Sequence, residues 1–251
     1  MDTSLYLTIA LGAVVAGFVQ GLSGFAFGLV AMSFWAWTVD PRLAAVLATA
    51  GALTGQLIAA FTVRRGFNKA LLMPFVVGGL IGVPLGVWLL PMLNVPVFKA
   101  CLGTLLVLWC PAMLMSRKLP RVTAGGRWAD AVAGWLGGVC GGIGGFAGAV
   151  PTLWCTLRGM EKDVQRAVVQ NFNLTMLSVA FALQLGTGLV TRDMLPLIAM
   201  VAVCVLVPVL LGARLYIGIS EANFRKIVLG LLTASGVALL ASSLPVLLQR
   251  A

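Results

Sequence analysis

Long apolar runs separated by short polar breaks make up almost the whole sequence. Eight such runs occupy residues 4–39, 43–63, 70–92, 96–116, 129–157, 167–189, 194–213 and 223–248. A membrane-crossing helix needs about 20 predominantly apolar residues, because each residue adds ~1.5 Å. The pattern therefore predicts an all-α polytopic membrane protein. No polar stretch is long enough for a soluble domain, so we expect a single membrane domain over residues 1–251.

Two of the runs are longer than one crossing requires. They cover residues 4–39 and 129–157, and each contains a glycine-rich phrase, GFVQGLSGFA at 17–26 and GVCGGIGGFA at 138–147. Glycine weakens a helix by about 1 kcal/mol relative to alanine and allows the chain to turn. We therefore expect each run to break at its phrase, with tips within 21–24 and 141–145, and to return to the side from which it entered.

The glycine phrase belongs to a wider internal repeat. The Ala-Val pair at 45–46 recurs at 167–168, at nearly the offset that separates the two phrases. We predict two repeats, residues 1–118 and 127–251, each a glycine-rich re-entrant, broken-helix hairpin followed by three transmembrane helices. Three crossings are an odd number, so the second repeat would be inverted relative to the first. Inverted halves are common in secondary transporters.

The basic residues support this topology. With both overlong runs returning, 13 basic residues face one side and four the other, whereas eight full crossings would divide them 9 to 8. The positive-inside rule favours the uneven division and places both termini outside the cytoplasm. The 13 are Arg64, Arg65, Lys69, Arg117, Lys118, Arg121, Arg127, Arg158, Lys162, Arg166, Arg214, Arg225 and Lys226, and the four are Arg42, Lys99, Arg192 and Arg250.

The predicted breaks also suggest a binding site. A half-helix that starts inside the membrane presents free N–H groups and the positive end of its dipole, which favours a small anion. The alternative is that the glycines only pack helices and the polar side chains only bond neighbouring helices. The candidate substrate-binding residues are Gln20, Gly21, Ser23, Gly24, Phe25, Thr49, Gly144, Gly145, Phe146, Gln170, Asn171 and Asn173.

Net charge and missing residue types narrow the function. The formal charge of +10 is explained by topology, so we expect no nucleic-acid partner, only a small anionic substrate and membrane lipid. The chain has no histidine, and its seven acidic residues lie at run ends or in loops. That argues against an enzyme, a bound metal and a buried proton relay. We expect no cofactor other than a coupling ion, H⁺ or Na⁺, with Asp40, Asp130 and Asp163 as rim candidates for a relay or as structural residues.

Two further groups of residues have a simple interpretation. Arg158, Lys162 and Arg166 could draw anions towards the inner mouth, although topology alone explains them. The tryptophans, Trp109 among them, lie mainly towards run ends and are interpreted as interfacial anchors.

The chain resembles the TauE/SafE sulfite exporter family over nearly its whole length. The resemblance rests on GLSGFAFG and GGIGGFAGAVP, each followed by an Ala-Val helix start, and on the size and number of apolar runs. It implies a multi-pass carrier in the bacterial inner membrane for sulfite, sulfoacetate, other organosulfonates or small carboxylates. The family usually has GxGGG in the first phrase and a Thr-Ser pair where this chain has Asn171-Phe172, which indicates a tailored pocket.

Three functions remain open at this point. The first is a secondary transporter that moves a small anion by alternating access of two halves. The second is a passive anion channel or facilitator, and the third is a membrane scaffold that transports nothing. The sequence leaves the oligomeric state open.

Overall fold

The computed structural model describes residues 3–62, 66–116, 121–215 and 221–249, with side chains omitted at 221–225. Most of these residues are helical, with no strand among them. The elements are α1 (Thr3–Ser23), α2 (Phe27–Trp35), α3 (Pro41–Thr62), α4 (Lys69–Leu89), η1 (Leu90–Met92), α5 (Val95–Met115), α6 (Gly126–Gly144), α7 (Ala149–Leu157), α8 (Lys162–Gly186), η2 (Arg192–Met194), α9 (Leu195–Leu215) and α10 (Glu221–Leu248).

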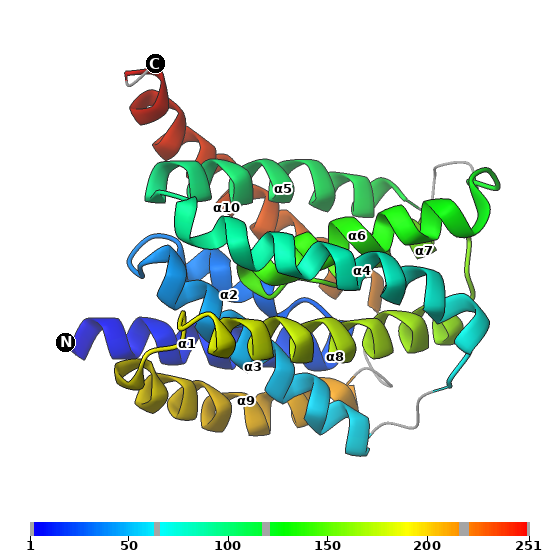
Figure 1. Ribbon diagram of the computed structural model, residues 1–251, viewed down its shortest axis with the longest axis horizontal. Helices are drawn as coiled ribbons and strands as arrows, with labels where there is room; N and C mark the ends of the chain where they lie inside the picture. The colour runs from blue at the N-terminus through cyan, green and yellow to red at the C-terminus, as the bar shows by residue number, and fades with distance from the viewer. Residues whose placement is uncertain (1–2, 63–65, 117–120, 216–220, 250–251) are drawn as a thin grey trace.

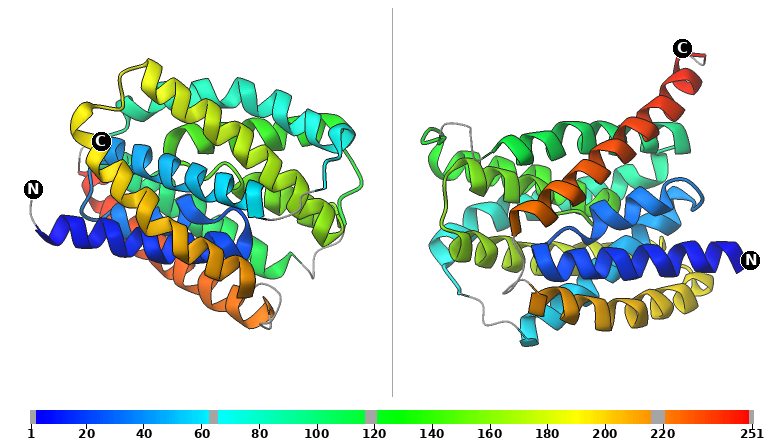
Figure 2. Two further views of the ribbon diagram at one scale, coloured as in Figure 1. Left: turned by 90° about the horizontal axis from the view of Figure 1, so that it is seen from below. Right: turned by 180° about the vertical axis from the view of Figure 1, so that it is seen from behind.

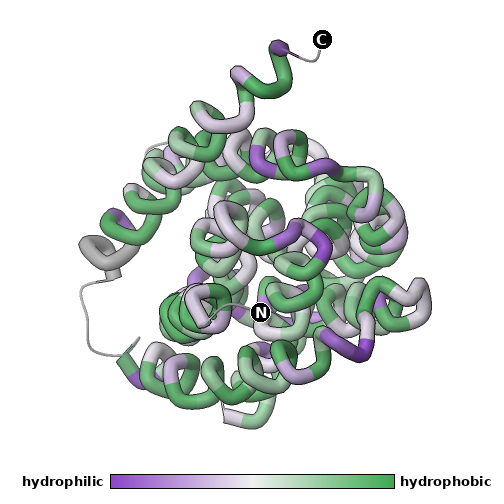
Figure 3. Tube along the Cα trace, turned by 90° about the vertical axis from the view of Figure 1, so that its left-hand side faces the viewer, coloured by the Kyte–Doolittle hydropathy of each residue, from purple (hydrophilic) through white to green (hydrophobic). Residues whose placement is uncertain are grey.

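Seven helices in the described part are long and apolar enough to cross a membrane: α1, α3, α4 with η1, α5, α8, η2 with α9, and α10. Many of their apolar side chains face outwards, such as Ile81, Val203 and Leu231, each about two-thirds exposed. Figure 3 shows apolar residues along nearly all helices. A soluble protein rarely exposes so much apolar surface, whereas lipid covers it readily. The predicted all-α polytopic membrane protein is confirmed.

Both overlong runs break, as predicted. The first is interrupted between α1 and α2, where Gly24 has a φ of 84°, and the second between α6 and α7, where Gly145 has a φ of 71°. Only glycine adopts such angles without strain. The returning arms α2 and α7 have nine residues each, about half a crossing at ~1.5 Å per residue.

Most other glycines of the two phrases lie inside helices and allow close packing. Gly21 lies against the backbone of α9, and Gly138 and Gly142 lie against the backbone of α4. The two breaks also touch each other, because a Cβ on Gly28 would lie 2.7 Å from the carbonyl carbon of Gly145. The turns are made at Gly24 and Gly145, the last residues of the two predicted tips. For Gly21, Gly138 and Gly142 the structure matches the packing interpretation.

The long helices run side by side, so their termini gather at two opposite ends of the molecule (Figure 1). At one end α1 begins and α10 ends. At the other, here called the basic end, the helices α3, α5, α7 and α9 end (Figure 2). The half-helices α2 and α7 return towards the ends from which α1 and α6 start.

The described basic residues are distributed between the two ends as the topology with two returning runs predicts. Lys69, Arg121, Arg127, Arg158, Lys162, Arg166, Arg214 and Lys226 belong to helix ends and connections of the basic end, and Arg42, Lys99 and Arg192 to those of the opposite end. The side chains of Arg64, Arg65, Arg117, Lys118, Arg225 and Arg250 lie outside the described part. The assignment of the basic end to the cytoplasm remains a prediction.

The helices α1–α5 and α6–α10 show the same succession: a long helix, a nine-residue helix and three long helices. Moreover, α1 and α6 begin at opposite ends of the molecule (Figure 1). An inverted repeat would produce this order. The repeat relation, with halves 1–118 and 127–251 in one transport domain, stays a prediction.

An ion pair ties α6 to α7 at the basic end. Arg158 Nη1 lies 2.5 Å from Asp130 Oδ1, and Trp154 Nε1 donates a hydrogen bond to the same oxygen at 2.7 Å. Asp130 is only 3% exposed. Asp40, another rim candidate, accepts hydrogen bonds from the N–H groups of Arg42 and Leu43 at the start of α3. Both carboxylates thus have a structural explanation.

We expect Asp130→Asn to destabilise the protein by about 1–3 kcal/mol, because the guanidinium of Arg158 would lose its buried counter-charge. Thermal unfolding in detergent measures this effect. Asp193→Asn, an exposed carboxylate in η2, should leave the melting temperature unchanged. Adding Arg158→Gln to Asp130→Asn should recover part of the loss. Equal melting temperatures for Asp130→Asn and wild type would contradict the structural role of the pair.

Candidate functional site

A cavity of about 270 Å³ lies beside the break between α1 and α2 and is bordered by α5, α7, α8 and α10. Its polar lining comes mainly from α7 and α8: Thr152, Thr156, Lys162, Gln165, Arg166 and Gln170, with Ser23 from the first break. Its apolar lining includes Phe25, Trp109 and Met113. The cavity is near the lower end of the size range of small-molecule sites, ~300–1,000 Å³.

Two basic residues and a glutamine of α8 line this cavity. Lys162, Arg166 and Gln170 follow one another at four-residue intervals, which places them on one face of the helix. Arg166 Nη2 donates to the carbonyl of Gly21 at 3.4 Å, near the end of α1. Gln170 is 2% exposed and lies against Gly24. No acidic side chain is among the described residues that line the cavity.

Side chains satisfy the backbone of the first break. Ser23 Oγ donates to the carbonyl of Val19 at 2.8 Å and accepts hydrogen bonds from the N–H groups of Phe25 and Ala26 at 3.3 and 3.1 Å. Unsatisfied backbone groups are costly in a membrane, so these bonds let the helix end there.

Two glutamines hold the break against α3. Gln56 Nε2 donates to the carbonyl of Gly24 at 2.7 Å, and Gln20 Nε2 donates to the carbonyl of Ala52 at 2.9 Å. The carbonyl of Gly24, which the helix break leaves without a helical hydrogen bond, therefore accepts one from Gln56. The break is a fixed feature of the protein interior rather than a frayed helix end.

The half-helix N-termini are not the open anion sites that we expected from the sequence. The first residues of α2, Phe27 and Gly28, are buried, and Gly28 packs against Gly145. In α7, Ala149 is buried with its N–H bonded to the carbonyl of Phe146, and Pro151 has no N–H at all. The charge in the cavity comes instead from Lys162 and Arg166.

The structure brings half of the predicted binding residues together. Ser23, Phe25 and Gln170 line the cavity. Gln20, Gly21 and Gly24 lie directly behind it, around a space of about 10 Å³ that Arg166 and Gln170 also border.

The other predicted residues lie elsewhere. Thr49, which accepts a hydrogen bond from Gln184, lies against Gly145 at the second break, beside Gly144. The amide of Asn173 lies against Gly148, and Asn171 donates to the carbonyl of Gly66 in the connection after α3. None of these residues lines the cavity.

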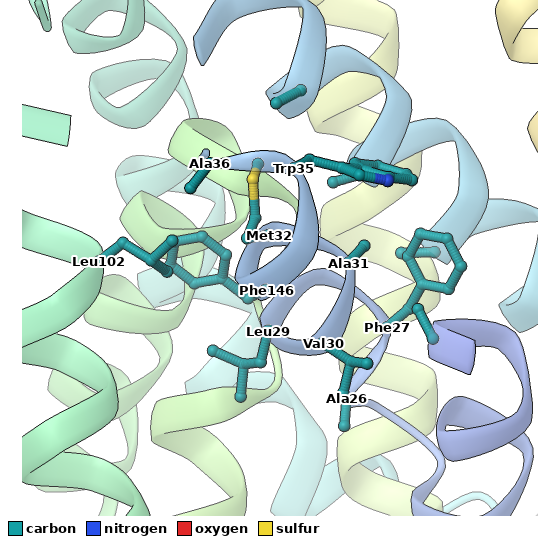
Figure 4. Close-up of a cluster of buried hydrophobic side chains, with 14 of the residues drawn as sticks. Ala26, Phe27, Leu29, Val30, Ala31, Met32, Trp35, Ala36, Leu102 and Phe146 are labelled. Atoms are coloured by element: carbon teal, nitrogen blue, oxygen red, sulfur yellow. The ribbon is translucent and has the colours of Figure 1, made fainter. Parts of the chain in front are cut away.

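Phe146 belongs to the apolar core between the two half-helices. It lies beside Leu29, Met32 and Leu102, and all four side chains belong to one buried apolar cluster (Figure 4). Leu29 and Met32 follow the break along α2 towards the opposite end, whereas Trp109 of the cavity lies beyond Leu102 along α5, towards the basic end. The cavity therefore lies on the basic side of these buried side chains, here called the apolar seal.

Sequence reasoning missed several lining residues. Arg166 was interpreted as a topology or steering residue, although its four-residue spacing to Gln170 was visible in the sequence. Trp109 is not an interfacial anchor: it is 4% exposed, its Nε1 donates to the carbonyl of Ala149 at 2.7 Å, and its ring meets that of Phe25 edge-on at 5.8 Å. Thr152 and Gln165 gave no signal in the sequence.

A comparison of the sequence with known protein families identifies a family of membrane transporters, in agreement with the fold. The sequence profile of the family described as Sulfite exporter TauE/SafE matches residues 9–239, which include every residue that lines the cavity. No curated protein and no solved structure matches the chain significantly. The match covers far more than half of the sequence. This multi-pass membrane protein belongs to the sulfite exporter TauE/SafE family of transporters.

Proposed function

We propose that this chain is a secondary transporter, not an enzyme, that moves a small anion across the cell inner membrane by alternating access. The substrate is sulfite or an organosulfonate such as sulfoacetate. One observation carries this proposal: the cavity beside the first helix break contains Arg166 and Lys162 but no described carboxylate. Family membership supports the substrate class.

The chemistry of the cavity suits an oxyanion. A guanidinium donates hydrogen bonds in a planar fork that matches two oxygens of one headgroup, and charge-assisted bonds of this kind are strong. Away from bulk water the attraction is less screened. Ser23, Gln165 and Gln170 add polar groups around the same space.

The apolar seal supports an alternating cycle. In the structure the cavity lies on the basic side of Leu29, Met32, Leu102 and Phe146. A transported anion would pass only when this packing opens and the basic side closes. We propose that the two half-helices, which meet at Gly28 and Gly145, move relative to each other in that step. Coupling to H⁺ or Na⁺ would provide the driving force.

Binding and flux test the proposed function. Purified protein should show a rise in melting temperature with sulfite or sulfoacetate, because a ligand that binds only the folded state stabilises it. In proteoliposomes it should accumulate the same anion against its gradient when a pH or sodium gradient is imposed. Flux that only equilibrates would identify a passive facilitator. Absence of both binding and flux would contradict transport of these anions.

A further inference from the structure

Thr152 of α7 has a buried hydroxyl that differs from those of Thr49, Thr156 and Thr175. Its Oγ1 has no hydrogen-bond partner among the described residues, although the residue is only 4% exposed. Thr49, Thr156 and Thr175 each bond the carbonyl four residues earlier. Thr152 lines the cavity instead.

The neighbours of Thr152 fix its position without using its hydroxyl. Gln165 Nε2 donates to Thr156 Oγ1 at 2.9 Å and to the carbonyl of Thr152 at 3.3 Å. This contact holds the middle and the end of α7 against Gln165 of α8. Buried polar groups are nearly always paired, so this hydroxyl at the cavity wall is available to bond whatever occupies the cavity.

We infer that Thr152 donates a hydrogen bond to the substrate headgroup and selects sulfonate-type anions over carboxylates. This inference rests on the proposed function. Arg166 reaches the cavity from α8 and takes two oxygens of a headgroup in the plane of its guanidinium. A carboxylate is planar and has no other oxygen. Sulfite and sulfonates are pyramidal, so their third oxygen leaves that plane and reaches the hydroxyl on α7.

The test compares sulfoacetate with malonate, which has a carboxylate in place of the sulfonate and the same charge. Dissociation constants are measured by calorimetry on the full chain in detergent. Thr152→Val, which keeps the side-chain shape, should weaken sulfoacetate and sulfite binding at least tenfold, on the scale of one hydrogen bond to a charged group. Malonate binding should change less than twofold. The melting temperature without ligand should be unchanged or higher, because no bond is lost.

Two variants serve as controls. Thr152→Ser keeps a hydroxyl and should bind sulfoacetate within about threefold of wild type. Thr175→Val removes a hydroxyl of α8 that does not line the cavity and should leave both affinities unchanged.

Three results would overturn the inference. Wild-type affinity of Thr152→Val for sulfoacetate would show that the hydroxyl is not a ligand, and equal losses for sulfoacetate and malonate would show that it does not select. If either result is found while Arg166→Gln abolishes sulfoacetate binding, the proposed function stands without this inference. Failure of sulfite, sulfoacetate and malonate to bind the wild type would contradict both.

Discussion

Arg166→Gln is expected to raise the Kd for sulfite or sulfoacetate about thirtyfold or more and to stop transport in proteoliposomes. The side chain lines the cavity, and its Nη2 also bonds the carbonyl of Gly21 at the end of α1. Glutamine keeps hydrogen-bonding capacity but removes the charge and the two-pronged donor. Hydrogen bonds to charged groups contribute about 1.5–3 kcal/mol each, which supports an effect of this size.

Arg127→Gln is the matched control for this experiment. Arg127 is an exposed residue at the same end, in the first turn of α6, and does not line the cavity. Both variants lower the net charge by one, so a general loss of electrostatic attraction would affect them equally. Similar Kd values for Arg166→Gln and wild type would exclude this cavity as the anion site. An equal loss in both variants would reduce the role of Arg166 to long-range steering.

The two turning glycines should respond differently to alanine. In Gly24→Ala the new Cβ meets the end of the Gln170 side chain at 3.0 Å, and this amide is able to move. The φ of 84° adds about 1–2 kcal/mol of strain. The protein should fold with a slightly lower melting temperature and bind its anion about tenfold less tightly, because Gln170 is displaced from the cavity wall.

Gly145→Ala should instead destabilise the fold strongly. Its Cβ would lie 2.8 Å from the carbonyl carbon of Ala48 and from the nitrogen of Thr49, both backbone atoms of α3. Backbone strain of about 1–2 kcal/mol and overpacking of about 1–3 kcal/mol act together. Thermal unfolding and calorimetry on both variants separate stability from binding.

Gly230→Ala provides the control for these glycine variants. A Cβ at Gly230 in α10 meets no atom within 4 Å, so alanine should be neutral or slightly stabilising. A Gly145→Ala protein as stable as wild type would contradict the close approach of the second break to α3. Unchanged affinity of Gly24→Ala would contradict the role of Gln170 in the cavity.

Much of the fold was predictable from the sequence because the membrane imposes simple rules. The lengths of the apolar runs gave the helices, and the two glycine phrases marked both breaks. The uneven division of basic residues gave the direction of each described helix. Run length and the glycine phrases are local features, and the count of basic residues is a sum over the whole chain. All three can therefore be obtained from a single sequence.

The site was less predictable because it depends on contacts between distant segments. Gly21 and Gly24 look alike in the sequence, yet the first packs against α9 and only the second makes the turn. The glycines that precede α7 predict an anion site at its N-terminus, but Ala149 is buried there and Pro151 lacks an N–H. Asn171 and Asn173 are close in sequence, but the helix directs them to different neighbours.

A density map of the protein with bound sulfoacetate tests the central claim most directly. We predict that the headgroup lies in the cavity beside the break between α1 and α2, in contact with Arg166 of α8 and Thr152 of α7. Density for the anion at the second break, or at the exposed surface with the cavity left without it at saturating concentration, would contradict this account.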